Sequence, residues 1–372
     1  MVEAWHRPTE AIIDLSAIKE NIKLEKELLK KPQQLFAVVK ANAYGHGLIP
    51  VAFAAQAAGA DGFCVAVIDE GLALRRAGIT KPILILGVNP AATAPLLAAN
   101  NLAVAVDSLE FLKQAAVSLH AQRLRLSVHL ALDTGMSRIG FKTTDDLAAV
   151  VDFLRTHTKE FDFQGIFTHF ATADAAEADY YQQQLKKFKQ LLTIVDPLPT
   201  YVHVANSAAS LWHQACGGNM VRFGVSMYGL NPSGRVRKLP AAFKPALSLV
   251  SELAAVREIQ TGESVGYGKT YTAQQTEWIG TVPLGYADGW LRRMQGSKVL
   301  INGHGCEIVG RVCMDQIMVR LPQCLPVGTK VTLIGKDGQQ QITAQQVADY
   351  AQTIHYEILC GISERVPRKY LD

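Results

Sequence analysis

Eight short apolar runs, separated by segments with helical character, constrain the fold of this chain more than any other feature. Most of the runs lack alternation of polar and apolar residues, which is typical of strands that are buried on both faces. Helix-like segments such as 69–78, 108–122 and 180–192 separate most of them, and strands that alternate with helices predict a parallel sheet. The runs are 35–40, 63–67, 82–86, 102–106, 124–132, 165–169, 201–205 and 221–225.

Eight strand and helix units of about 240 residues together favour an α/β fold of the (β/α)₈ barrel type, which has roughly 250 residues. An open, doubly wound sheet is the alternative. From Pro245 onward the sequence changes to short strand-like runs with Gly-rich turns, and only 343–354 looks helical. We therefore expect a barrel over 14–240 and a mainly β domain over 241–372, to which the N-terminal strand 1–13 belongs.

Composition narrows the class of protein. The 372 residues are 49% hydrophobic and carry a net charge of only +4, so large cores can form and no nucleic acid or membrane partner is indicated. The start of the chain lacks the pattern of a signal peptide. The cysteines form no C-x-x-C pair, which suggests reduced, mostly buried thiols in a cytosolic protein. They are Cys64, Cys216, Cys306, Cys313, Cys324 and Cys360.

Polar residues gather at the ends of the predicted strands, where the chemistry of such barrels takes place. A serine at a helix start and a glycine after the last strand offer the hydroxyl and N–H groups of the usual phosphate site. The sequence contains neither a P-loop nor a metal-ligand spacing. The strand-end residues are Lys40, Tyr44, Arg138, His169, Asn206, Ser207, Gly224 and Val225, with Arg222 inside the eighth strand.

Lys40 lies at the mouth of a buried strand, where a charged ammonium group is unfavourable. A partly desolvated lysine loses proton affinity and becomes a usable nucleophile. A lysine that faces a phosphate-bearing cofactor suggests a Schiff base with pyridoxal phosphate. The alternative is a structural ion pair at the strand end, and these residues alone leave both interpretations open.

Eight motifs over nearly the whole chain resemble the alanine racemase family. They are AVVKANAYGHG, LDTGMSRIGF, GIFTHFATAD, ANSAAS, VRFGVSMYGL, GYADGW, GRVCMDQ and ISERVPR. The resemblance implies a pyridoxal 5′-phosphate enzyme with a barrel and a C-terminal β domain. It also implies a head-to-tail homodimer that interconverts L-alanine and D-alanine, which supplies D-alanine for peptidoglycan.

The same resemblance assigns roles to residues. Lys40 would hold the cofactor as an internal aldimine and act as one base, while Tyr267 would be the second base in the partner subunit's barrel. Arg222 would face the pyridine nitrogen and leave it unprotonated, because a guanidinium keeps its proton, and His169 would lie behind it. The phosphate-binding set would be Tyr44, Ser207, Gly224, Val225 and Tyr356, with Asn206 nearby, and the substrate contacts would be Arg138, Met314 and Tyr286.

Structural roles are the alternative for several of these residues. Tyr267 and Tyr286 could be half-buried strand tyrosines, Met314 could fill a core, and His169 could be a core histidine.

Position 131 departs from the family. Many members have a carbamylated lysine there that holds the arginine corresponding to Arg138, and Ala131 cannot carry a carbamate. Asp133, water or a small anion such as chloride could replace it. We favour the anion, because the short side chain leaves volume beside a fixed positive charge.

Three other functions fit parts of this pattern. A decarboxylase of basic amino acids shares the architecture but would resemble a family with an acidic residue in place of Arg222. A non-enzymatic pyridoxal-phosphate-binding protein would be a barrel alone, without the part beyond Pro245. A racemase of broader specificity, for serine or basic amino acids, is the third.

Overall fold

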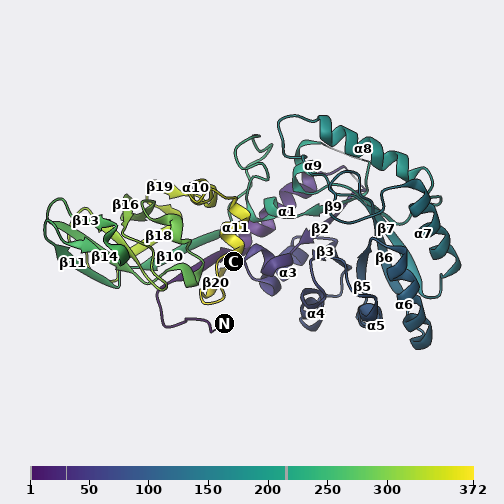
Figure 1. Ribbon diagram of the computed structural model, residues 1–372, viewed down its shortest axis with the longest axis horizontal. Coiled ribbons are helices and arrows are strands. Elements are labelled where there is room, and N and C mark those ends of the chain that lie inside the picture. Colours follow the sequence, from purple (N-terminus) through teal and green to yellow (C-terminus); the bar gives the residue numbers. More distant parts are fainter. Residues whose placement is uncertain (1, 31, 214–216) are drawn as a thin grey trace. The chain divides into compact units, whose positions relative to one another are not determined.

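The structure, a computed structural model, describes residues 2–30, 32–213 and 217–372 (Figure 1). Contacts divide the chain into two compact units. The barrel unit comprises Ser16–Ala43 and Leu48–Pro245, and the β unit comprises Met1–Leu15, Tyr44–Gly47 and Ala246–Asp372. None of the helices in the described part of the chain has the length and apolar character needed to cross a membrane.

The barrel unit contains eight parallel strands, as predicted. Their order is β8-β7-β6-β5-β4-β3-β2-β9, and a parallel bridge between Ala205 and Val221 brings the two ends of the sheet together. The last strand pairs with the first, so the alternative of an open doubly wound sheet is wrong. The strands are β2 (Gln34–Val38), β3 (Gly62–Val65), β4 (Ile83–Ile85), β5 (Leu102–Val106), β6 (Leu126–Ala131), β7 (Phe161–Phe167), β8 (Tyr201–His203) and β9 (Met220–Phe223).

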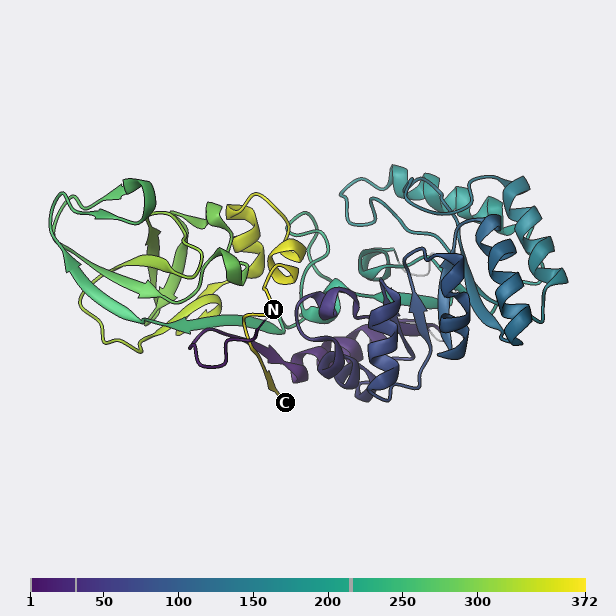
Figure 2. The same cartoon turned by 60° about the horizontal axis from the view of Figure 1, so that its bottom comes forward.

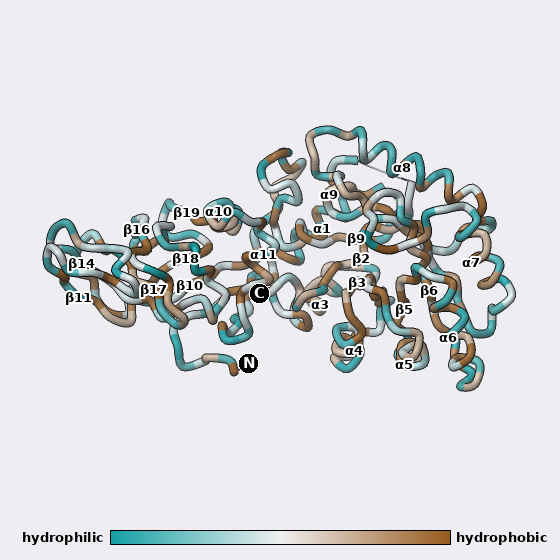
Figure 3. The backbone as a smooth tube through the Cα atoms, in the orientation of Figure 1, coloured by the Kyte–Doolittle hydropathy of each residue, from teal (hydrophilic) through white to brown (hydrophobic). Residues whose placement is uncertain are grey.

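Helices lie outside the barrel strands (Figures 1 and 2). All residues of β5 are buried, while helix α8 is mostly hydrophilic (Figure 3), because only one side of an outer helix faces the core. The helices are α1 (Leu15–Leu28), α3 (Leu48–Ala57), α4 (Ile68–Arg76), α5 (Ala94–Ala99), α6 (Leu109–Gln122), α7 (Thr144–Thr156), α8 (Asp179–Leu192) and α9 (Ser207–Trp212), with short 3₁₀ turns η1 (Ala91–Thr93) and η2 (Val225–Tyr228).

A strained turn follows the first barrel strand. The last four residues of α2 (Lys40–Tyr44) have φ angles of 52–53°, a left-handed conformation that costs roughly 1–2 kcal/mol per non-glycine residue. Side chains hold it in place, since Glu70 accepts a hydrogen bond from the amide of Ala41 (2.6 Å) and Asn42 accepts one from the amide of Leu48 (2.7 Å). The end of the strand is therefore fixed at the expense of local strain.

The β unit is mainly a ten-stranded sheet in the order β11-β14-β17-β16-β15-β18-β10-β1-β20, with β19 beside β18. Its N-terminal strand β1 (Glu10–Asp14) pairs with β10 and β20, so the segment ahead of the barrel supplies a strand. A separate hairpin joins β12 (Ser264–Val265) and β13 (Tyr271–Thr272). The sheet strands are β1 (Glu10–Asp14), β10 (Leu247–Glu252), β11 (Ala255–Ile259), β14 (Glu277–Val282), β15 (Lys298–Ile301), β16 (His304–Val309), β17 (Ile317–Leu321), β18 (Lys330–Asp337), β19 (Gln340–Ile342) and β20 (Arg368–Leu371).

Two helices of the β unit follow one another near the C-terminus. Helix α10 (Ala344–Tyr350) was predicted, whereas α11 (His355–Cys360) was not, so the expectation of a single helical segment is wrong. The signal was present in the sequence, because His355, Ile358 and Leu359 are the buried positions of α11 and have helical spacing.

The five described cysteines are free thiols. Cys64 and Cys306 are buried, but Cys324 and Cys360 are exposed, so the prediction of mostly buried thiols is wrong. Cys360 ends the short helix α11 on its outer side. Cys216 lies outside the described residues.

Candidate functional site

One cavity of about 330 Å³ in the barrel unit brings four of the predicted residues together. Lys40, Arg138, His169 and Arg222 all line it, and Ala131 forms part of its wall. They come from different strands or the loops after them, and they meet because the carboxyl ends of parallel barrel strands share one face. The volume falls in the range of small-molecule sites, which begins at about 300 Å³.

Arg222 is buried in β9 and held by neutral acceptors. Its Nη1 donates to Nδ1 (2.8 Å) and to the carbonyl oxygen (3.1 Å) of His203. Its Nη2 donates to the carbonyl of Thr168 (3.0 Å) and lies 3.2 Å from Nδ1 of His169. A guanidinium only donates hydrogen bonds, so the two histidine nitrogens must be the acceptors. These contacts orient the positive charge without adding a negative one.

A third histidine, His129, extends this chain of contacts. Nε2 of His203 lies 2.8 Å from Nδ1 of His129. Because Nδ1 of His203 accepts from Arg222, the proton of neutral His203 sits on Nε2 and is donated to His129. Burial, and then the charge of Arg222, lower the pKa of His129 to about 3. The same causes, with His129 as a further one, hold the pKa of His203 well below its usual value.

His129 and His203 were not among the predicted site residues. The available signal was a histidine within an apolar run that is buried on both faces, since each lies in a barrel strand with buried neighbours. His169, which was predicted, also has a pKa well below its usual value, because of burial, then Arg222, Arg138 and Lys40. The histidines around Arg222 are thus neutral at neutral pH.

The loops after the last two barrel strands form a small polar cradle. The hydroxyl of Ser207, at the start of α9, accepts a hydrogen bond from the amide of Gly224 (2.9 Å). Asn206 caps the same helix by accepting from the amide of Ala209 (2.9 Å). Val225 opens η2 directly after Gly224. A hydroxyl and a backbone N–H at this position fit a phosphate group.

The remaining predicted residues belong to the β unit. The rings of Tyr44 and Tyr356 lie 5.9 Å apart. Tyr267 (70% exposed) lies in η3 (Tyr267–Lys269) and Tyr286 (43%) in η4 (Tyr286–Asp288), while Met314 is 52% exposed. Neither tyrosine lies in a strand and Met314 is exposed, so the alternatives of strand tyrosines and a core methionine are wrong.

The structure shows what Asp133 does. Its carboxylate accepts hydrogen bonds from backbone amides, including that of Ser137 (2.9 Å), and lies 3.4 Å from Nζ of Lys142. Burial raises the pKa of Asp133, but these amides and Lys142 outweigh it and lower the pKa. Asp133 thus holds the turn before Arg138. Ala131 is buried in the wall of the cavity that Arg138 lines.

Comparison with known families agrees with this architecture. The family model described as "Alanine racemase, N-terminal domain" matches residues 13–232, and "Alanine racemase, C-terminal domain" matches residues 246–370. The fold and these matches define a class, the pyridoxal-phosphate-dependent amino-acid racemases with a barrel and a β domain. The chain belongs to the alanine racemase family. Membership of this family excludes two of the alternatives, the non-enzymatic protein that is a barrel alone and the decarboxylase of basic amino acids.

Individual relatives support the family assignment. The chain is 60% identical to the alanine racemase of Ligilactobacillus salivarius over 370 residues, all of both chains. It matches the crystal structure of alanine racemase from E. faecalis with a TM-score of 0.98 and 52% identity over all of both chains. A histidine racemase from Leuconostoc mesenteroides matches with a TM-score of 0.94 and 35% identity, again over all of both chains.

Proposed function

We propose that the chain interconverts L-alanine and D-alanine with two bases, Lys40 of one subunit and Tyr267 of its partner. Racemisation needs a proton donor and acceptor on each face of the α-carbon. The observation that supports this most is the location of the two groups. Lys40 lines the barrel cavity, whereas Tyr267 extends from the β unit with 70% of its surface exposed. In this proposal the D-alanine that forms is used for peptidoglycan.

In this proposal the cofactor is pyridoxal 5′-phosphate, and the barrel residues suit it. Lys40 offers the amine, Ser207 and Gly224 offer a phosphate cradle, and Arg222 and His169 lie together at the cavity. When bound, the cofactor withdraws electrons from the α-carbon of an attached amino acid. Arg222 keeps its proton, so it would leave the pyridine nitrogen unprotonated and moderate that withdrawal, which limits side reactions.

Further residues complete the proposed site. Tyr44, Tyr356, Val225 and Asn206 would help to hold the cofactor. Arg138, Met314 and Tyr286 would contact the substrate or line its entrance.

A homodimer follows from the proposal, because two of its parts reside in different units. The barrel, 14–240, would bind the cofactor, and the β domain, 241–372 with strand 1–13, would contribute to the partner's site. The exposure of Tyr267, Tyr286 and Met314 supports this, since all three side chains are open in the single chain. The free thiols of the described cysteines support a cytoplasmic location.

Mixing two inactive variants tests the composite site. Lys40→Ala and Tyr267→Phe are each expected to be inactive as homodimers. After reversible dissociation, mixed dimers contain one site with an intact lysine and an intact tyrosine, so some activity should return. Two differently tagged chains allow the mixed dimers to be purified. Verified mixed dimers without activity would contradict the shared site.

A separate measurement tests Lys40 as the attachment point. The purified protein should be yellow, and borohydride should remove the visible absorbance and leave a stable cofactor adduct. Peptide mass mapping should place that adduct on Lys40. An adduct on another lysine would show that the assignment is wrong, whatever the result of the mixing experiment.

Substrate range remains a second question within the same family. The related histidine racemase shares 35% identity with this chain, so the fold also accommodates a larger side chain in that protein. We propose alanine as the preferred substrate, because the relatives of 50–60% identity are alanine racemases. Exchange of the α-proton in D₂O, followed for a series of L-amino acids, would test this. Faster exchange with serine, histidine or lysine would overturn the preference.

A further inference from the structure

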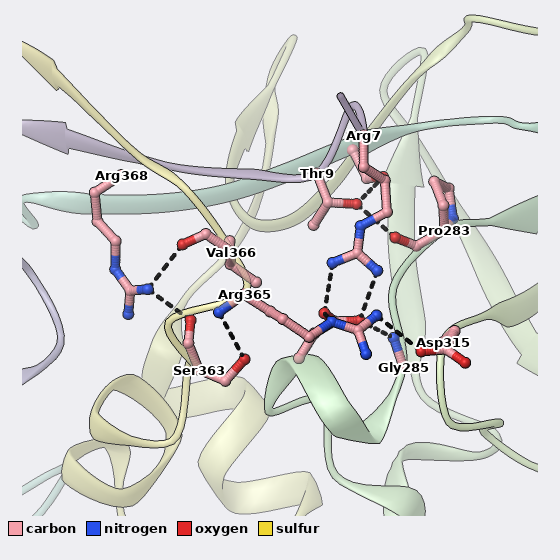
Figure 4. Close-up of polar contacts among 11 residues, drawn as sticks. Arg7, Thr9, Pro283, Gly285, Asp315, Ser363, Arg365, Val366 and Arg368 are labelled. Carbon is pink, nitrogen blue, oxygen red and sulfur yellow. Dashed lines mark hydrogen bonds and ion pairs between the residues drawn. The ribbon is translucent and has the colours of Figure 1, made fainter. Parts of the chain in front are cut away.

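A charged cluster in the β unit lies beside two loops that the proposed function places at the partner's site. The carboxylate of Asp288 is fully enclosed and faces two arginines. Arg7 donates to both of its oxygens, at 2.5 and 3.2 Å, and Nε of Arg365 lies 3.1 Å away. Figure 4 shows the guanidinium groups of Arg7 and Arg365 converging beside Gly285. Both oxygens of this carboxylate thus accept from a charged donor.

Asp288 also closes the turn that contains Tyr286. Its Oδ2 accepts a hydrogen bond from the amide of Gly285 (2.8 Å), and its own amide donates to the carbonyl of Gly285 (3.0 Å). A side-chain carboxylate that accepts from the residue three positions earlier fixes a single turn in one conformation. The direction in which Tyr286 leaves this turn therefore depends on Asp288.

The same cluster connects this turn to the loop of Met314. The amides of Tyr286 and Ala287 donate to the carbonyls of Cys313 and Met314, both at 3.0 Å. Nη2 of Arg365 pairs with Asp315 at 2.8 Å, next to Met314 in the sequence. Backbone bonds and a bridging guanidinium thus join the two loops.

The N-terminal segment supports the cluster from the other side. The hydroxyl of Thr9 donates to the carbonyl of Pro283 (2.7 Å), just before the turn, and lies 2.8 Å from the hydroxyl of Ser251. The amide of Ala4 donates to the carbonyl of Arg365 (3.0 Å). Ala4, Arg7 and Thr9 are therefore part of the framework that fixes the two loops.

We propose that Asp288, bridged by Arg7 and Arg365, is a positioning residue that holds Tyr286 and Met314 in one arrangement for the partner's site. The link to substrate binding rests on the proposed function, but the link to the order of the two loops does not. Asp288 itself touches no reacting group, because it is enclosed beneath the turn. Its effect should appear in how alanine binds rather than in the chemistry at Lys40.

Asp288→Asn tests this with little change of shape. An amide keeps one acceptor oxygen but turns an NH₂ group toward a donor, either an arginine or the amide of Gly285. We expect amide hydrogen exchange in peptides spanning 284–290 and 312–317 to become about tenfold faster. The KM for alanine should rise about fivefold with a much smaller change in kcat. The absorption spectrum of the bound cofactor should stay the same.

Two further variants separate positioning from general destabilisation. Arg365→Lys keeps a positive charge but cannot reach both Asp288 and Asp315, so it should share the KM effect in weaker form. Leu333→Ala removes a fully buried side chain of β18 and should lower Tm without changing exchange in the two loops or the KM.

Three results would decide the matter. Unchanged loop exchange and KM in Asp288→Asn would overturn the proposal, as would an equal rise of KM in Leu333→Ala. If exchange in Asp288→Asn is faster only in the two loops but the wild-type protein shows no racemase activity, the proposed function is refuted and the structural link stands.

Discussion

Arg222 in the barrel unit and Arg365 in the β unit are both largely enclosed guanidinium groups, but their surroundings differ in charge. Arg222 donates to imidazole nitrogens and backbone carbonyls. Arg365 pairs with two carboxylates, Asp288 and Asp315. The barrel cluster orients a positive charge, whereas the β cluster neutralises one.

The difference indicates what each cluster is suited to do. A charge surrounded by neutral dipoles in a cavity can still polarise a ligand, because the field is strong where water is excluded. A charge matched by carboxylates contributes mainly geometry, because its field is cancelled nearby. We therefore expect changes to Arg222 to alter the chemistry, and changes around Arg365 to alter stability and loop order.

The largest effect is expected from emptying the β cluster. Asp288→Ala leaves the guanidinium groups of Arg7 and Arg365 facing each other without their shared carboxylate. Breaking a buried ion pair from one side costs about 3 kcal/mol or more, so the free energy of unfolding should fall by that amount in urea denaturation. The exposed partner Asp315, changed to Ala, is the control and should cost less than about 1 kcal/mol. Equal losses of unfolding free energy in Asp288→Ala and Asp315→Ala would show that the enclosed carboxylate is no more important for stability than the exposed one.

A comparable change in the barrel cluster should affect catalysis. Arg222→Gln keeps hydrogen-bonding ability but removes the charge at the cavity. We expect kcat/KM to fall roughly 100-fold, which corresponds to about 2.7 kcal/mol, and the absorption spectrum of the bound cofactor to change. Steady-state kinetics and visible spectra would measure both. A variant with full cofactor and near-normal kcat/KM would show that the charge of Arg222 is not used.

The histidine chain predicts a dependence of stability on pH. The pKa of His129 is about 3 in the folded protein, below its ordinary value of 6.5, so unfolding at pH 5 takes up a proton. The contribution of neutral His129 to the free energy of unfolding is complete above pH 6.5 and is lost as the pH falls toward 3. The loss is about 2 kcal/mol between pH 6.5 and pH 5.

His129→Phe should remove that part of the slope while lowering stability at pH 7, because the Nε2–H group of His203 loses its acceptor. Denaturant titrations of both proteins at pH 7 and pH 5 would show it. An identical slope in the variant would mean that His129 does not titrate on unfolding.

The smallest effect concerns a third arginine, Arg138, beside the buried Ala131. Asp133 is engaged in its turn, so we expect chloride or water, and not Asp133, to brace this arginine. We predict that chloride lowers the KM for alanine by about two- to fivefold, in line with a single ion pair at a partly exposed site, and that bicarbonate has no effect. Kinetics in chloride-free buffer with added chloride would measure this. A constant KM would favour water.

Local hydrophobicity explains which parts of the fold were predictable. A run such as 102–106, with five successive apolar residues between helix-like segments, is typical of a short strand that is buried on both faces. Lys40, Ser207 and Gly224 follow such strands, so their location at one end of a barrel could be inferred from order alone. The second helix of the β unit was missed because its helical spacing extends over only six residues, fewer than in a typical helix.

What only the tertiary structure decided are the contacts between distant residues. Arg7 and Asp288 are 281 positions apart, and neither belongs to a pattern that predicts the other. The same holds for His129 of β6 and His203 of β8, which meet across the strand β7 that pairs with both. The left-handed turn at α2 also contradicts the local preference of its residues, and side chains from other segments hold it. Burial and periodicity are properties of the sequence, whereas the pairing of charges and the storage of strain depend on which segments the fold brings together.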